Sequence, residues 1–127
     1  MRELWMVGAA GALGAMSRFG LSRTAERLTS SGWPLGTLAV NLLGCLLLGL
    51  AIEGLQLRET FSREAGLALT VGFLGSFTTF STFSHETVAL LERGEVLIAS
   101  GYVALSVVAG CGLCLVGMRV ARALWAT

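Results

Sequence analysis

Residues 70–86 read TVGFLGSFTTFSTFSHE, and this stretch carries the strongest structural signal in the chain. It belongs to a run from Ala65 to His85 without a formally charged residue. A helix needs about 20 such residues to cross the hydrocarbon of a bilayer. The second half of the stretch is unusual for a lipid-facing helix, because hydroxyl and phenyl side chains replace aliphatic ones.

Three further apolar stretches predict three further membrane spans. The first is Leu4 to Ser17, after which Arg18 interrupts a stretch that resumes briefly. The second is the uncharged run 28–52, in which Pro34 predicts a helix start near Leu35. The third is the uncharged run 96–118. A signal peptide is the alternative for the first stretch, but it has a weak basic flank and no clear Ala-x-Ala site.

The predicted connections between these spans are short, which makes neighbouring helices antiparallel. They comprise the segment that carries Arg18, Arg23 and Arg27, then residues 53–64, then residues 86–95. The sequence therefore predicts an all-α integral membrane protein, with one four-transmembrane-helix domain over residues 1–127.

Composition supports a membrane protein. Of the 127 residues 54% are hydrophobic and 13% are charged, and the mean hydropathy is +0.76. A soluble domain this short could not bury so much apolar surface. The net charge of +1 offers no basic face for nucleic acid. The three cysteines lie in apolar runs, which argues against a secreted disulfide framework.

The nine basic residues are all arginine, and the predicted topology divides them almost evenly between the two membrane faces. One face receives Arg2, Arg58, Arg63, Arg119 and Arg122. The other receives Arg18, Arg23, Arg27 and Arg93. Because arginine asymmetry sets orientation in the membrane, five against four leaves almost no bias. We hypothesise that the chain inserts both ways and pairs with an inverted copy.

The third span carries six hydroxyl side chains and three phenylalanines between Ser76 and Ser84. Residues three apart share a helix face, so Phe80 and Phe83 should line one face. Ser81 and Ser84 should form the adjacent stripe, with Thr78 one turn earlier. Such a wall could guide a polar species. The alternative is that these hydroxyls bond back to helix carbonyls and simply pack.

Three other features of the spans leave alternatives open. Gly72, Gly75 and Ser76 could let the third helix break near mid-membrane, and carbonyls exposed there could bind a cation. Asn41 could be interhelical glue or an amide donor to an anion. Arg18 could extend to the interface or attract anions at a pore mouth.

Three motifs in this order resemble the Fluc (CrcB-type) family of bacterial fluoride channels. They are GAAGALGAMSR at residues 8–18, GTLAVNLLG at residues 36–44 and GFLGSFTTFSTFS at residues 72–84. The third motif is highly specific, and the resemblance covers nearly the whole chain. Two departures stand out. Ser76 replaces the second glycine usual in the third motif, and Gly110 replaces a serine often found on the fourth helix.

The resemblance implies a fold and a function. It implies an antiparallel homodimer of four-helix protomers, each with a broken third helix, in the inner membrane of a bacterium. It implies two pores for passive fluoride efflux that protects against fluoride toxicity. It implies a structural sodium ion at the dimer interface and no soluble protein partner.

The resemblance also implies roles for individual residues. The sodium ion would be held by the main-chain carbonyls of Gly75 and Thr78. Arg18 and Glu86 would lie in the vestibule. The fluoride-contacting residues would be Phe80, Phe83, Asn41, Ser81, Thr82, Ser84, Tyr102 and Ser106.

Other functions fit less well. A small multidrug transporter needs a membrane-embedded carboxylate, whereas Glu3, Glu53 and Glu86 lie at predicted span ends. Ser81 and His85 lack the surroundings of a hydrolase nucleophile. The pair Cys111 and Cys114 has no partner ligands that would make a metal site. A purely structural membrane subunit remains an alternative.

Overall fold

The computed structural model describes residues 1–28, 32–58 and 61–125. The described residues are almost entirely helical and contain no β-strand. Four helical segments are long and apolar enough to cross a membrane: Arg2–Leu28, Leu35–Leu57, Arg63–Glu92 and Val96–Trp125. The predicted all-α, four-span architecture is therefore confirmed.

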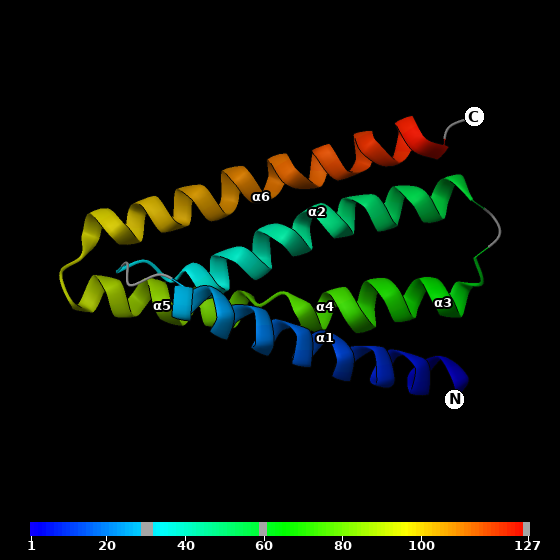
Figure 1. The fold of residues 1–127 in the computed structure, drawn as a ribbon, viewed down its shortest axis with the longest axis horizontal. Helices are drawn as coiled ribbons and strands as arrows, with labels where there is room; N and C mark the ends of the chain where they lie inside the picture. The colour runs from blue at the N-terminus through cyan, green and yellow to red at the C-terminus, as the bar shows by residue number, and fades with distance from the viewer. Residues whose placement is uncertain (29–31, 59–60, 126–127) are drawn as a thin grey trace.

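The four spans form an up-and-down bundle with both termini at the same end (Figure 1). Helix α2 packs mainly on α6, and α1 packs mainly on the third span at η1 and α4 (Figure 1). The elements are α1 (Arg2–Leu28), α2 (Leu35–Leu57), α3 (Arg63–Leu67), the π-helix η1 (Ala68–Leu74), α4 (Gly75–Phe77), α5 (Phe80–Glu92) and α6 (Val96–Trp125).

Most of the helices extend beyond the apolar spans predicted from the sequence. Helix α1 continues through Arg18 to Leu28, so Arg18, Arg23 and Arg27 lie on this helix and not in a connection. An arginine near the membrane surface can stay helical because its long side chain reaches the headgroups. Helix ends therefore lie beyond the charges that bound the hydrocarbon. The predicted start of α2 at Leu35, after Pro34, is confirmed.

Glycines bring the helix backbones into contact, as the small-residue pattern indicates. A Cβ atom on Gly49 of α2 would collide with the carbonyl of Cys114 on α6, and one on Gly117 would collide with the carbonyl of Leu46. A Cβ on Gly14 of α1 would collide with the carbonyl of Phe73 in η1. Both principal helix contacts of the bundle therefore depend on glycine, which has no side chain to keep the two backbones apart.

Glu53 lies in an environment that the sequence does not indicate. Glu53 is only 6% exposed, although its position near the end of a span predicts a carboxylate at the membrane interface. The side chain is tied to Arg122 of α6 through Nε to Oε1 at 2.7 Å and Nη2 to Oε2 at 3.1 Å. Two parallel charge-assisted bonds fix both side chains in one geometry. The pair therefore joins α2 and α6 at the end that carries the termini.

Removing one member of this pair should destabilise the bundle. We expect Arg122→Gln to lower the midpoint of thermal unfolding in detergent, because it leaves the Glu53 carboxylate buried without its cation. Arg119→Gln, which removes an exposed arginine of the same helix, should leave the midpoint nearly unchanged. Equal midpoints for the two variants would contradict a stabilising role of the pair. Adding Glu53→Gln to Arg122→Gln should recover part of the loss.

Candidate functional site

The hydroxyl-rich segment of the third span contains two residues in extended conformation. Helix α4 ends at Phe77 and α5 begins at Phe80. Thr78 has φ −89° and ψ 159°, and Thr79 has φ −147° and ψ 114°. Figure 1 shows the non-helical connection between α4 and α5 facing α2. The π-helix η1 lies just before α4, and π-helical turns are frequent at functional sites.

Asn41 of α2 binds this extended segment through both ends of its amide. The Thr79 N–H donates to Oδ1 of Asn41 at 2.8 Å, and Nδ2 of Asn41 donates to the Thr79 carbonyl at 3.0 Å. The structure thus gives Asn41 a role as interhelical glue. One further N–H of the amide remains for another acceptor.

The hydroxyls near the extended segment form two groups. Thr79 is buried, and its Oγ1 donates to Oγ1 of Thr82 at 2.9 Å and lies 3.3 Å from Oγ of Ser81. It also caps α5, accepting from the Thr82 N–H at 3.2 Å. By contrast, Thr78 and Ser84 donate to carbonyls four residues earlier, at 3.2 and 2.9 Å. These two residues thus make the bonds to helix carbonyls that the packing alternative describes.

The predicted stripe of Thr78, Ser81 and Ser84 is wrong in one respect. Thr78 lies in extended backbone, so the helical three-residue spacing does not place it one turn before Ser81. Thr79 provides the nearby hydroxyl instead. Thr79 is not among the site residues predicted from the sequence. Its signal is the N-cap pattern, in which a threonine precedes a new helix.

The aromatic rings form a short row. The ring centroids of Phe80 and Phe83 are 5.6 Å apart at 43°, which confirms that they share a face. Phe83 also meets Tyr102 of α6 at 5.2 Å and 54°. Phe80 is 79% exposed whereas Tyr102 is fully buried. The row therefore runs from the surface of the four-helix bundle into its core.

A cavity of about 310 Å³ lies beside this row. Most of its lining is apolar, but it includes Asn41, Thr78, Thr79 and Ser106. Oγ of Ser106 is buried and has no hydrogen-bond partner among the described residues. This hydroxyl therefore has its hydrogen-bonding capacity free for a group that enters the cavity. Phe80, Phe83 and Gly75 also line the cavity.

Glu86 of α5 lies at one end of the row and is held by two hydroxyls. Thr37 donates its Oγ1 to Oε1 at 2.8 Å, and Tyr102 donates its OH to Oε2 at 2.8 Å. Thr37 is buried and was not predicted as a site residue. Its signal is position, because it lies one helical turn before Asn41 on the same helix.

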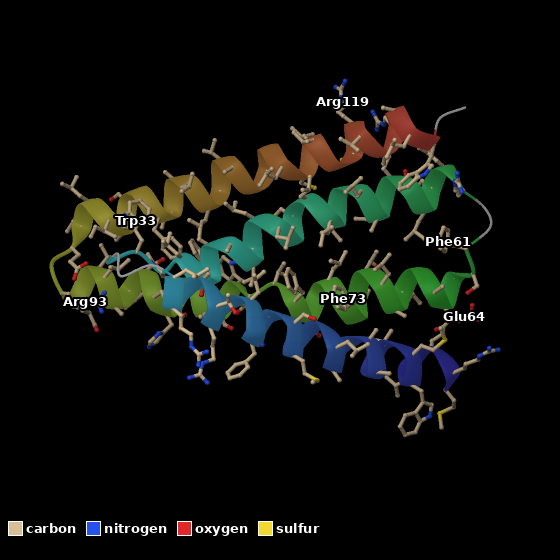
Figure 2. The ribbon with its side chains drawn as sticks, viewed as in Figure 1. Trp33, Phe61, Glu64, Phe73, Arg93 and Arg119 are labelled. Atoms are coloured by element: carbon tan, nitrogen blue, oxygen red, sulfur yellow. The ribbon has the colours of Figure 1, made fainter. Side chains whose placement is uncertain are left out.

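A second cavity, of about 300 Å³, adjoins Glu86 near the end of the bundle. His85, Arg93 and Trp33 also line it. In Figure 2, Trp33 and Arg93 lie at the end of the molecule opposite Arg119. Arg18 lines neither cavity. The structure therefore brings together predicted residues of the second, third and fourth spans: Asn41, Gly75, Thr78, Phe80, Phe83 and Ser106 line the first cavity, and Glu86 lines the second.

Comparison with known proteins identifies the family. The sequence profile described as "CrcB-like protein, Camphor Resistance (CrcB)" matches residues 5–118. A protein of Geobacter sulfurreducens is 45% identical over 117 residues, covering 92% of this chain and 91% of the relative. A protein of Geobacter sp. (strain M21) is 44% identical over 124 residues, covering 98% and 100%. One of Rhizobium etli is 40% identical over 124 residues, covering 98% and 99%.

Each of these relatives bears the name "Fluoride-specific ion channel FluC". Four apolar spans agree with a multi-pass protein of the cell membrane. The resemblance to the CrcB-type family is thereby confirmed. The family is one of ion channels, so the chain is not an enzyme, and the hydrolase alternative is excluded. The chain belongs to the CrcB-like family of membrane ion channels.

Proposed function

We propose that this chain is a fluoride-selective channel that lets fluoride leave the cell passively and so limits fluoride toxicity. The observation that carries the proposal is the identity of 40–45% over nearly the whole chain to proteins named as fluoride-specific channels. The polar and aromatic lining of the third span supports it, because that lining has the chemistry that a small anion needs.

Fluoride is small and strongly hydrated, so a pore must replace its lost water with donors. Hydroxyls of Ser81, Thr82 and Ser106 can donate to an anion. The edges of aromatic rings carry partial positive charge, so Phe80 and Phe83 can meet the ion edge-on. Asn41, Ser84 and Tyr102 complete the proposed lining, and Glu86 and Arg18 are proposed for the vestibule.

The pore lining contains no fixed cation. No Lys or Arg occurs between Ala65 and His85. Conduction requires sites that bind an ion well enough to admit it and weakly enough to release it. Neutral hydroxyls and ring edges provide such weak, repeated sites, whereas an arginine in the narrow part would hold the anion.

We propose an antiparallel homodimer with two pores. Phe80 is 79% exposed on the protomer, and Ser81 and Thr82 are exposed beside it. Irregular backbone such as that at Thr78 and Thr79 is tolerated inside a bilayer only where protein or water covers it. A second copy would cover this face, and the near-equal arginine counts allow that copy to be inverted.

The main-chain oxygens of Gly75 and Thr78 are proposed ligands of a structural sodium ion. Among the residues described, no three His, Cys, Asp or Glu side chains come together to hold a metal. Neither carbonyl accepts a hydrogen bond from another described residue. Neutral hard oxygen donors suit a hard cation, so the two carbonyls fit the ion. When bound, sodium would offset part of the cost of a nearby anion.

The experiment that tests the function is fluoride efflux from liposomes that contain the purified protein. Vesicles that contain the protein and trapped fluoride are diluted into fluoride-free buffer, and an ionophore is added to balance the charge. A fluoride electrode should then record release of the trapped fluoride. Chloride loaded in the same way should stay inside. Equal release of both anions would refute selectivity, and release no faster than from protein-free vesicles would refute the channel.

The inverted arrangement makes a separate prediction. A C-terminal tag should be accessible to a membrane-impermeant reagent from both faces of the cell membrane. A tag on a control protein of fixed orientation should react from one face only. Labelling of this chain from a single face would exclude the antiparallel dimer without bearing on fluoride selectivity.

A further inference from the structure

The contacts of Asn41 have a consequence for the backbone of the third span. In a continuous helix the Thr79 N–H would donate to the carbonyl of Gly75, four residues earlier. In this structure it donates to Oδ1 of Asn41 at 2.8 Å. The preceding N–H, of Thr78, still donates to the carbonyl of Leu74 at 3.2 Å. The helical ladder therefore stops at the residue that Asn41 binds.

The amide of Asn41 is suited to hold an extended residue. Among neutral side chains, only a carboxamide offers a strong N–H donor and a carbonyl acceptor side by side. These match the N–H and C=O of Thr79, which it binds at 2.8 and 3.0 Å. Thr79 is 8% exposed, so its peptide groups would pay a desolvation penalty without these partners. Asn41 is also the only asparagine in the chain.

We propose that Asn41 is a positioning residue that clamps Thr79 in extended geometry and thereby keeps the carbonyl of Gly75 free of its helical donor. The clamp acts on the pore from outside the helix that carries the aromatic pair, because α5 starts directly after Thr79. It also sets where α5 begins, since Thr79 caps it through Oγ1. The consequence for conduction rests on the function proposed above.

The sequence offers two isotope labels that report on the clamp alone. Gly75–Ser76 is the only Gly-Ser pair in the chain, and Thr78–Thr79 is the only Thr-Thr pair. Protein labelled with ¹³C-carbonyl glycine and ¹⁵N-serine therefore gives one carbonyl-to-amide cross-peak, from the carbonyl of Gly75. Protein labelled with ¹³C-carbonyl threonine and ¹⁵N-threonine gives one, from the amide of Thr79.

In wild-type protein in micelles, the Thr79 amide should exchange slowly with deuterium. The Gly75 carbonyl has helical φ and ψ but no helical donor, so it should resonate upfield of hydrogen-bonded helical carbonyls. In Asn41→Leu, which removes both bonds but keeps a side chain branched at Cγ, the Gly75 carbonyl should move downfield, toward the shift of hydrogen-bonded helical carbonyls, as the Thr79 N–H turns to it. Thr79→Val is the matched control. It keeps both peptide groups and loses only the hydroxyl, so the Gly75 carbonyl should not move.

Two results would overturn the clamp. One is a wild-type Gly75 carbonyl shift equal to that of hydrogen-bonded helical carbonyls. This measurement needs no variant, so it stands even if Asn41→Leu does not fold. The other is an unchanged Gly75 resonance in folded Asn41→Leu. Fluoride efflux from liposomes that contain the wild-type protein tests the proposed function separately. Absence of efflux would refute that function, whereas the Gly75 and Thr79 resonances would still test the clamp.

Discussion

Replacing Phe80 or Phe83 with isoleucine is expected to cut fluoride efflux severalfold while the protein stays folded. Isoleucine keeps the site apolar but has no positive ring edge to present to an anion. An aromatic contact contributes about 1 kcal/mol beyond its burial, which corresponds to roughly fivefold in rate per ring. The two rings lie 5.6 Å apart, so their losses should be coupled and not simply multiply.

The two rings should differ in their effect on stability. Phe80 is largely exposed on the bundle, whereas Phe83 packs on the buried cluster that includes Leu38, Leu90 and Tyr102. We therefore expect Phe83→Ile to lower the unfolding midpoint more than Phe80→Ile does. Flux should be compared at equal amounts of folded protein, judged by size-exclusion chromatography and circular dichroism.

Phe61→Ile provides the control for ring removal as such. Phe61 is exposed and lies near the end of the bundle that carries the termini, away from the aromatic row (Figure 2). Its replacement should leave the electrode trace unchanged. If both Phe80→Ile and Phe83→Ile conduct as well as Phe61→Ile, the rings have no part in ion passage.

Gly49→Ala is expected to cause the largest loss of stability from a single added methyl group. The new Cβ would collide with the main-chain carbonyl of Cys114, and a backbone atom cannot rotate away as a side chain can. Overpacking of this kind costs about 1–3 kcal/mol. The contact between α2 and α6 would have to widen, and the Glu53–Arg122 bonds that span it would stretch.

Gly112→Ala is the matched control on α6, because an added Cβ there meets no atom within 4 Å. Alanine has a higher helix propensity than glycine by about 1 kcal/mol, so this variant should be neutral or slightly stabilising. Thermal unfolding in detergent, followed by tryptophan fluorescence, measures both. Similar midpoints for Gly49→Ala and Gly112→Ala would show that α2 and α6 do not pack through this glycine.

The sequence by itself determined the class of the fold and the position of the aromatic pair. Uncharged runs of about 20 residues specify spans because the bilayer penalises charge, and this holds whatever the spans pack against. The pairing of Phe80 with Phe83 follows from helical spacing within four consecutive residues. The motif of residues 72–84 indicates the family without reference to any tertiary contact.

The tertiary structure decided the environments of Asn41, Glu53 and Glu86. Each depends on a partner far along the chain: Thr79 for Asn41, Arg122 for Glu53, and Thr37 for Glu86. No local periodicity encodes such pairs, because they form only when two helices meet at a particular rotation. Hydropathy treats a carboxylate near a span end as interfacial, whereas packing of α2 on α6 makes Glu53 a buried member of an ion pair.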